Sequence, residues 1–184
     1  MEIAHGVDSP TRTLSPGMAF KSMASMFVQL SPTIRRDEDA AQYVTTVSDS
    51  TDHAFFGNRY VFAYINTRTI SLDTRVNWTF SPNLTLQLFV QPFIASGAYS
   101  SFREFEKPRS VKKLVYGEDV GSIVRTPASG GNGASYTVDP DGAGPAAPFS
   151  FSDPDFTTRS LCGIAVLRWE YRPGSTCGRS SGRV

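Results

Sequence analysis

The fold is decided by the stretch ISLDTRVNWTF, residues 70–80. Five of its six even positions are apolar, and none of its five odd positions is. This two-residue period is typical of a β-strand with one apolar and one polar face, because a helix repeats about every 3.6 residues. The turn residues Ser81, Pro82 and Asn83 follow, and apolar residues then alternate again from Leu84 to Val90. The sequence therefore predicts a β-hairpin with a three-residue connection.

The same alternation recurs along the chain, and we expect an all-β, antiparallel sheet of long strands with no helix longer than two turns. The expected strands cover residues 20–34, 60–80, 84–105 and 158–171. Short turns that contain proline lie at one end of these strands, at residues 15–17, 81–83 and 172–175. Longer polar connections lie at the other end, at residues 48–58 and about 107–156. Short turns at one rim and long loops at the other are typical of an outer-membrane β-barrel.

The strand lengths and the aromatic residues support a transmembrane barrel. Ten residues of about 3.3 Å each, tilted by about 45°, cross roughly 25 Å of hydrocarbon. Trp78, Phe80, Trp169 and Tyr171 lie beside short turns, where an aromatic girdle meets the membrane interface. The residues expected to face lipid are Ile70, Leu72, Val76, Leu86 and Leu88. A soluble antiparallel sandwich would also alternate, but its strands usually have about five or six residues. We favour the barrel.

The composition excludes several classes of protein. The chain has 184 residues, of which 40% are hydrophobic and 19% charged, and its net charge is +1. It is too apolar for disorder, its two cysteines cannot make a disulfide scaffold, and its cations form no cluster for nucleic acid. The sequence contains no run of about 18 apolar residues, so it predicts no transmembrane helix. The first residues lack the basic and apolar regions of a signal peptide. We expect Cys162 and Cys177 to form no functional pair.

Polar residues at alternate positions are the candidate site. These are Asp73, Arg75, Asn77, Gln87, Arg168 and Glu170. In a barrel they would line the lumen, where we favour a salt-bridged wall that keeps the interior solvated over a solute path or a plug-contact surface. We expect no catalytic, cofactor-binding or metal-binding residues, and therefore no cofactor. The segment DPDGAG at 139–144 lacks the closing Glu of a calcium loop.

Several phrases of the sequence resemble one bacterial family. They are AQYV (41–44), RYVFA (59–63), QPF (91–93), VDPDGAGP (138–145) and LRWEYRPGST (167–176). From about residue 15 to residue 176 the chain resembles the domain-of-unknown-function family 5916. That family looks like the C-terminal outer-membrane barrel of larger proteins, which often carry a module similar to family 9 carbohydrate-binding domains. The resemblance implies a barrel in the outer membrane of a Gram-negative bacterium, without an established activity.

The organisation suggests a fragment of such a barrel. We expect an N-terminal stub over 1–14, a partial barrel domain over 15–176 with a long extracellular loop at about 107–157, and an aberrant polar tail over 177–184. Family members resemble the chain up to Thr176 and then continue with an apolar strand, which this polar tail cannot supply. About four long strands are too few for closure, which needs about eight. The expected partners are outer-membrane lipid, the remainder of the barrel and carbohydrate.

Three functions remain open at this point. The first, which we favour, is binding, transport or anchoring by an outer-membrane barrel, linked to carbohydrate. The second is a membrane-associated hydrolase with its active site outside this fragment or in the long loop. The third is a soluble β-sandwich that acts as a binding module. No grouping of Ser, His and Asp and no carboxylate pair at hydrolase spacing supports an enzyme.

Overall fold

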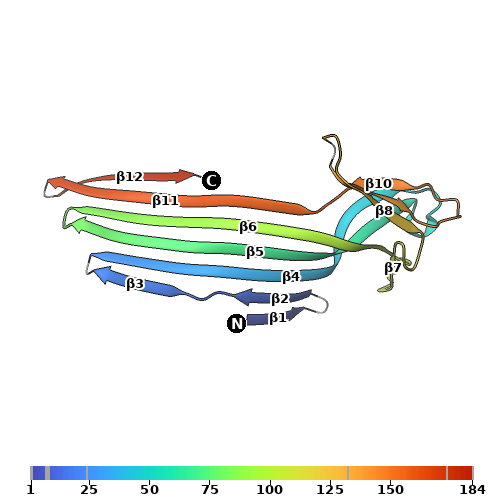
Figure 1. Cartoon of the computed structure of the whole chain (residues 1–184), viewed down its shortest axis with the longest axis horizontal. Helices are drawn as coiled ribbons and strands as arrows, with labels where there is room; N and C mark the ends of the chain where they lie inside the picture. The colour runs from blue at the N-terminus through green and yellow to red at the C-terminus, as the bar shows by residue number, and fades with distance from the viewer. Residues whose placement is uncertain (1, 7–8, 24, 132, 173, 184) are drawn as a thin grey trace.

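The protein is one long antiparallel sheet with a small second sheet at one end (Figure 1). The structure, a computed structural model, describes residues 2–6, 9–23, 25–131, 133–172 and 174–183. Helical geometry within these residues is limited to a 3₁₀ turn, η1 (His53–Phe55). No described helix has the length and the hydropathy that crossing a bilayer requires. The all-β, antiparallel fold expected from the alternation is therefore confirmed.

The long sheet has nine strands. They are β1 (Glu2–Gly6), β2 (Ser9–Leu14), β3 (Met18–Met23), β4 (Met26–Ser48), β5 (Asn58–Ser81), β6 (Leu84–Phe105), β7 (Lys113–Val115), β11 (Phe156–Arg172) and β12 (Ser175–Arg183). Their order is β1-β2-β4-β5-β6-β11-β12, with β3 also beside β4 and β7 also beside β6. Within the described residues the order does not close on itself, so the sheet is open.

The central hairpin forms as the alternation predicts. Strands β5 and β6 pair with Trp78 opposite Leu86 and Ile70 opposite Ile94. The connection is tighter than the three residues expected, because Ser81 itself pairs with Leu84. Pro82 and Asn83 alone form the turn.

The prediction of one strand over residues 20–34 was wrong, because the chain reverses inside this range. Strands β3 and β4 form a hairpin in which Met23 pairs with Met26 and Phe20 lies opposite Val28. Alternation does not reveal the reversal, since apolar residues stay on the same face on both sides of the turn. The expected N-terminal stub contains β1 and β2, and β2 pairs with β4.

The expectation that the polar tail supplies no further strand was also wrong. β12 pairs along β11, with Cys177 opposite Trp169 and Arg183 opposite Gly163. Strand pairing uses backbone N–H and C=O groups, which every such residue carries whatever its side chain, so a polar segment can extend a sheet. Pro173 of the expected turn, and Val184, lie outside the described residues.

The expected long loop contains secondary structure and covers the core of the protein. Besides β7, it holds a three-stranded antiparallel sheet of β8 (Ser122–Thr126), β9 (Ser135–Asp139) and β10 (Phe149–Ser152), in the order β10-β9-β8. A buried cluster joins this sheet to the ends of β5 and β6, and consists of Val61, Ala63, Phe102, Tyr116 and Val138. We call this end of the molecule the loop end, and the end beside Pro82 and Asn83 the turn end (Figure 1).

Candidate functional site

One face of the long sheet, which we call the polar face, carries all six candidate residues. They are Asp73, Arg75 and Asn77 of β5, Gln87 of β6, and Arg168 and Glu170 of β11. Asn77 lies directly opposite Gln87, and Gln87 lies opposite Val166 of β11. Because side chains alternate along a strand, Arg168 and Glu170 follow Val166 on the same face. The register thus brings three strands together to build this face.

The polar face is held by an amide contact and an aromatic contact. The side-chain amide of Gln91 donates a hydrogen bond to Asp73 Oδ1 at 2.6 Å. The guanidinium carbon of Arg75 lies 5.5 Å from the centre of the Phe89 ring, within the range of a cation–π interaction. None of the ion pairs within the described residues includes a candidate residue.

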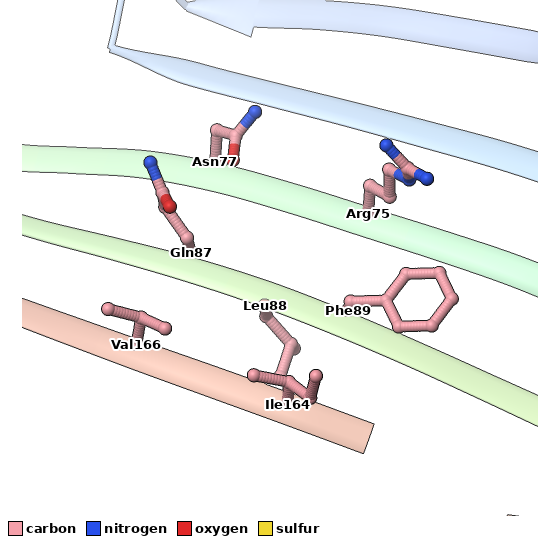
Figure 2. Close-up of a pocket in the computed structure, with 7 residues that line it drawn as sticks. All are labelled: Arg75, Asn77, Gln87, Leu88, Phe89, Ile164 and Val166. Carbon is pink, nitrogen blue, oxygen red and sulfur yellow. The ribbon is translucent and has the colours of Figure 1, made fainter. Parts of the chain in front are cut away.

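A shallow hollow of about 370 Å³ opens on the polar face (Figure 2). Its lining residues are Arg75, Asn77, Gln87, Phe89, Ile164 and Val166, together with Leu88, which lies between Gln87 and Phe89 in β6 and whose side chain is on the opposite face by register. Figure 2 shows Asn77 and Gln87 on neighbouring strands, with Arg75 and the Phe89 ring farther along the same two strands. The two amides both donate and accept hydrogen bonds, the guanidinium donates, and the ring and aliphatic groups supply apolar contact. Such a lining suits a polar molecule that also has an apolar surface.

Arg168 and Glu170 lie apart from this hollow, at the turn end. Together with Pro82, Asn83 and Thr85 they line a smaller hollow of about 150 Å³. Glu170 Oε1 accepts a hydrogen bond from the backbone N–H of Gly174 at 3.0 Å. Glu170 therefore ties β11 to the start of β12.

The opposite face, which we call the apolar face, carries a continuous belt of apolar side chains. All five residues expected to face lipid share this face. Val76 of β5 lies opposite Val28 of β4 and Leu88 of β6. Ile70, Leu72 and Leu86 lie at alternate positions from these in the same strands, so their side chains are on the same side. No second layer covers the belt within the described residues, and Ile70 is 39% exposed and Ile94 43% exposed.

Aromatic side chains close the belt at the turn end. Trp78 and Phe80 stack with their ring centres 4.2 Å apart, and Trp169 and Tyr171 lie 6.1 Å apart. All four rings are more than one third exposed. The aromatic pairs of two separate strands therefore end the apolar face at the turn end of the sheet.

A buried cluster of charged residues lies at the loop end. Arg59 Nη1 donates to both carboxylate oxygens of Glu104 at 2.6 Å, and Arg59 Nη2 donates to Asp49 Oδ2 at 2.8 Å. The Tyr116 hydroxyl donates to Glu104 Oε2 at 2.8 Å. The three charged side chains are only 10–11% exposed. This cluster ties the 49–57 connection to β5, β6 and the segment after β7.

Burial and pairing shift the pKa values of this cluster. Burial, and then the negative charge of Glu104, raise the pKa of Tyr116 far above its ordinary value. Burial alone would lower the pKa of Arg59, but its hydrogen bonds to Glu104 and Asp49 outweigh burial and raise it. Burial opposes ionisation of Asp49, yet hydrogen bonds from Thr51 and Arg59 hold the pKa of this carboxyl below its ordinary value. These pKa shifts favour a charged Arg59, a charged Asp49 and a neutral Tyr116.

Sequence reasoning did not identify this cluster. Arg59 alternates in phase with the buried Val61 and Ala63, which could have marked it as an inward-facing charge. Glu104 gave no such signal, because the pairing of β5 and β6 shifts register near Ser101, whose φ is 49°. This β-bulge changes which residues of β6 face the core.

The two aspartates of the segment at 139–144 hold their own loop through hydrogen bonds to its backbone. Asp139 Oδ1 accepts from the backbone N–H of Gly142 at 2.8 Å, and Asp141 Oδ2 accepts from that of Ala146 at 2.9 Å. The part of the chain that the structure describes holds no group of three His, Cys, Asp or Glu residues arranged for a metal. Cys162 is a free thiol.

Comparison of the chain with protein-family models, with curated proteins and with solved structures finds no match.

Proposed function

We propose that this sheet is a section of a Gram-negative outer-membrane β-barrel, with the apolar face toward lipid and the polar face toward a water-filled interior. The observation that supports this most is the belt itself. Four long strands place their apolar side chains on one face, and no layer of the described residues covers them. Soluble proteins rarely leave an apolar surface of this extent exposed, whereas a barrel presents one to lipid.

The height of the belt matches a bilayer. Along β5 it extends from Ile70 at the loop-end border to Phe80 at the turn end. Ten residues at about 3.3 Å each span roughly 33 Å along the strand, and a tilt of about 45° reduces this to roughly 23 Å. The aromatic pairs at Trp78 and Trp169 then lie where an interfacial girdle is expected. Under this proposal the short turns are periplasmic and the small sheet is extracellular.

The open edges of the sheet require further strands. β12 forms one edge, and β1 and β3 form the other within the described residues. An unpaired backbone N–H or C=O group costs several kcal/mol in hydrocarbon, so no open edge is stable there. We propose that the remainder of the barrel pairs with both edges, and that copies of this chain pair edge to edge in vesicles that contain no other strands.

We further propose that the polar face binds or conducts a polar solute of the carbohydrate class. The hollow at Arg75 combines planar amide and guanidinium groups with the Phe89 ring. Hydroxyl groups of a sugar can pair with the amides while its C–H face contacts the ring. This role is binding or transport and requires no catalytic group.

Thiol labelling in vesicles tests the orientation of the two faces. Single cysteines are placed at Asn77, Asp73, Val76 and Leu72 in a chain that carries Cys162→Ser and Cys177→Ser. We expect a membrane-impermeant maleimide to label positions 73 and 77 rapidly and positions 72 and 76 slowly, because thiolates form only in contact with water. Equal labelling of both sets would contradict the proposal and favour a soluble sandwich.

Titration calorimetry with neutral oligosaccharides tests the solute class. Asn77→Ala or Gln87→Ala removes side-chain hydrogen bonds worth about 1 kcal/mol each, so each change should weaken binding roughly fivefold. Ser71→Ala, a change on the same face but outside the hollow, is the matched control. Binding that is absent in the wild type, or equally strong in all variants, would exclude this hollow as a sugar site.

A further inference from the structure

Three arginines lie side by side on the apolar face near the loop end. Arg12 of β2 is directly opposite Arg36 of β4, and Arg36 is directly opposite Arg68 of β5. The same row continues with Ser96 of β6 and Thr157 of β11. Residues that face each other in an antiparallel sheet have Cβ atoms about 5 Å apart, so the three guanidinium groups share a small area. We call these three residues the arginine row.

The arginine row borders the apolar belt. The next row toward the turn end consists of Leu14, Ile34, Ile70 and Ile94, which lie opposite one another in the four strands. A hollow of about 420 Å³ is lined by all three arginines and by Leu14 and Ile34. On both β4 and β5 the last isoleucine of the belt is followed two residues later by an arginine of the row, so the belt ends at the same level on the two strands.

Within the described residues no carboxylate forms an ion pair with the arginine row, although Glu38 lies two residues from Arg36 on the same face of β4. Asp37, the carboxylate next to Arg36, points to the opposite face and pairs there with Arg35 at 2.6 Å. Asp155 shares a second hollow with Arg36 and Arg68, but its Oδ1 accepts a hydrogen bond from the backbone N–H of Tyr99. Like charges placed directly opposite each other destabilise a sheet, so the row favours an external anion.

We infer that the arginine row binds the phosphate groups of anionic lipid in the leaflet on the loop side of the membrane. This inference rests on the proposed function, because it needs the belt to lie in lipid. The guanidinium groups form a planar fork that pairs with phosphate through two hydrogen bonds. Lipid phosphates lie just outside the hydrocarbon, which is where the row lies relative to the belt. Acyl chains packed on the isoleucines would hold the headgroup against the arginines.

Flotation of the full chain with vesicles tests the inference. One set of vesicles is phosphatidylcholine alone, and the other also contains phosphatidylglycerol. Each arginine near an anionic surface raises membrane affinity about fivefold, so the triple variant Arg12→Gln, Arg36→Gln, Arg68→Gln should bind the anionic vesicles roughly a hundredfold more weakly than the wild type. Its binding to phosphatidylcholine should not change. The control triple Arg35→Gln, Lys107→Gln, Arg109→Gln removes the same charge elsewhere and should keep most of the anionic preference.

The outcomes separate the two proposals. A wild-type chain that binds neither type of vesicle would overturn the proposed function. A chain that binds both equally, or whose anionic preference falls equally in the two triple variants, would overturn the arginine-row site alone. Inorganic phosphate added at the same phosphate concentration should leave flotation unchanged, and displacement by it would show a site for a small free anion instead of lipid.

Discussion

Val76→Arg introduces a charge near the centre of the apolar belt. Val76 lies between Phe80 at the turn end and Ile70 at the loop-end border, and it is opposite Val28 and Leu88. A guanidinium group there would lie near the bilayer midplane, where an arginine on the lipid face of a barrel costs about 2–4 kcal/mol. We expect the free energy of unfolding to fall by this amount in vesicle-reconstituted protein, measured by urea titration with tryptophan fluorescence.

Two substitutions on the same strand make this result specific. Ile70→Arg lies at the border of the belt and should cost only about 0–1 kcal/mol, because an arginine near the interface reaches the headgroups. Asn77→Arg, on the neighbouring residue but the polar face, should have a similarly small effect. Equal costs at positions 76 and 77 would refute the assignment of the two faces. Equal costs at positions 70 and 76 would show that a layer of protein covers the belt, because the cost of the arginine would then not depend on its depth in the bilayer.

The remaining predictions concern the loop end and one strand contact. Glu104→Gln leaves buried Arg59 short of one negative charge and should lower the free energy of unfolding by about 3 kcal/mol in urea titrations; no change would mean that the cluster is solvated. The pKa of Tyr116 is raised in the folded state, so the neutral tyrosine stabilises the fold. Its contribution to the free energy of unfolding is complete below the ordinary tyrosine pKa of about 10 and is lost as the pH rises above that value. Tyr116→Phe should therefore flatten the alkaline fall in stability, and an unchanged profile would argue against this cause. A Cβ at Gly97 would meet the Phe156 ring, so Gly97→Leu should cost about 1–3 kcal/mol in thermal unfolding, and Phe156→Ala should relieve part of that cost.

The long strands could be predicted because their side chains alternate. Residues 70–80 and 84–105 form strands at the predicted positions, and the register then brings Asp73, Arg75, Asn77 and Gln87 onto one face. Alternation alone was sufficient here, since a strand with one apolar face has a single register that keeps that face intact.

Alternation fails where the chain turns without changing face or where pairing needs no side chain. The reversal between Met23 and Met26 preserves the apolar face, so the sequence reads as one strand. β12 forms through its backbone although its residues are polar. The cluster of Arg59, Glu104 and Tyr116 depends on a bulge near Ser101 and on contacts between distant segments, and no local pattern encodes either.

The contact between the apolar face and lipid can be measured directly with the two native tryptophans. The chain has two tryptophans, and Trp78 and Trp169 both lie on the apolar face at the turn end. In vesicles, we expect lipids brominated near the headgroup to quench their fluorescence strongly, lipids brominated deep in the chains to quench it weakly, and aqueous iodide to quench it little. Strong quenching by iodide with no quenching by either brominated lipid would contradict the membrane assignment.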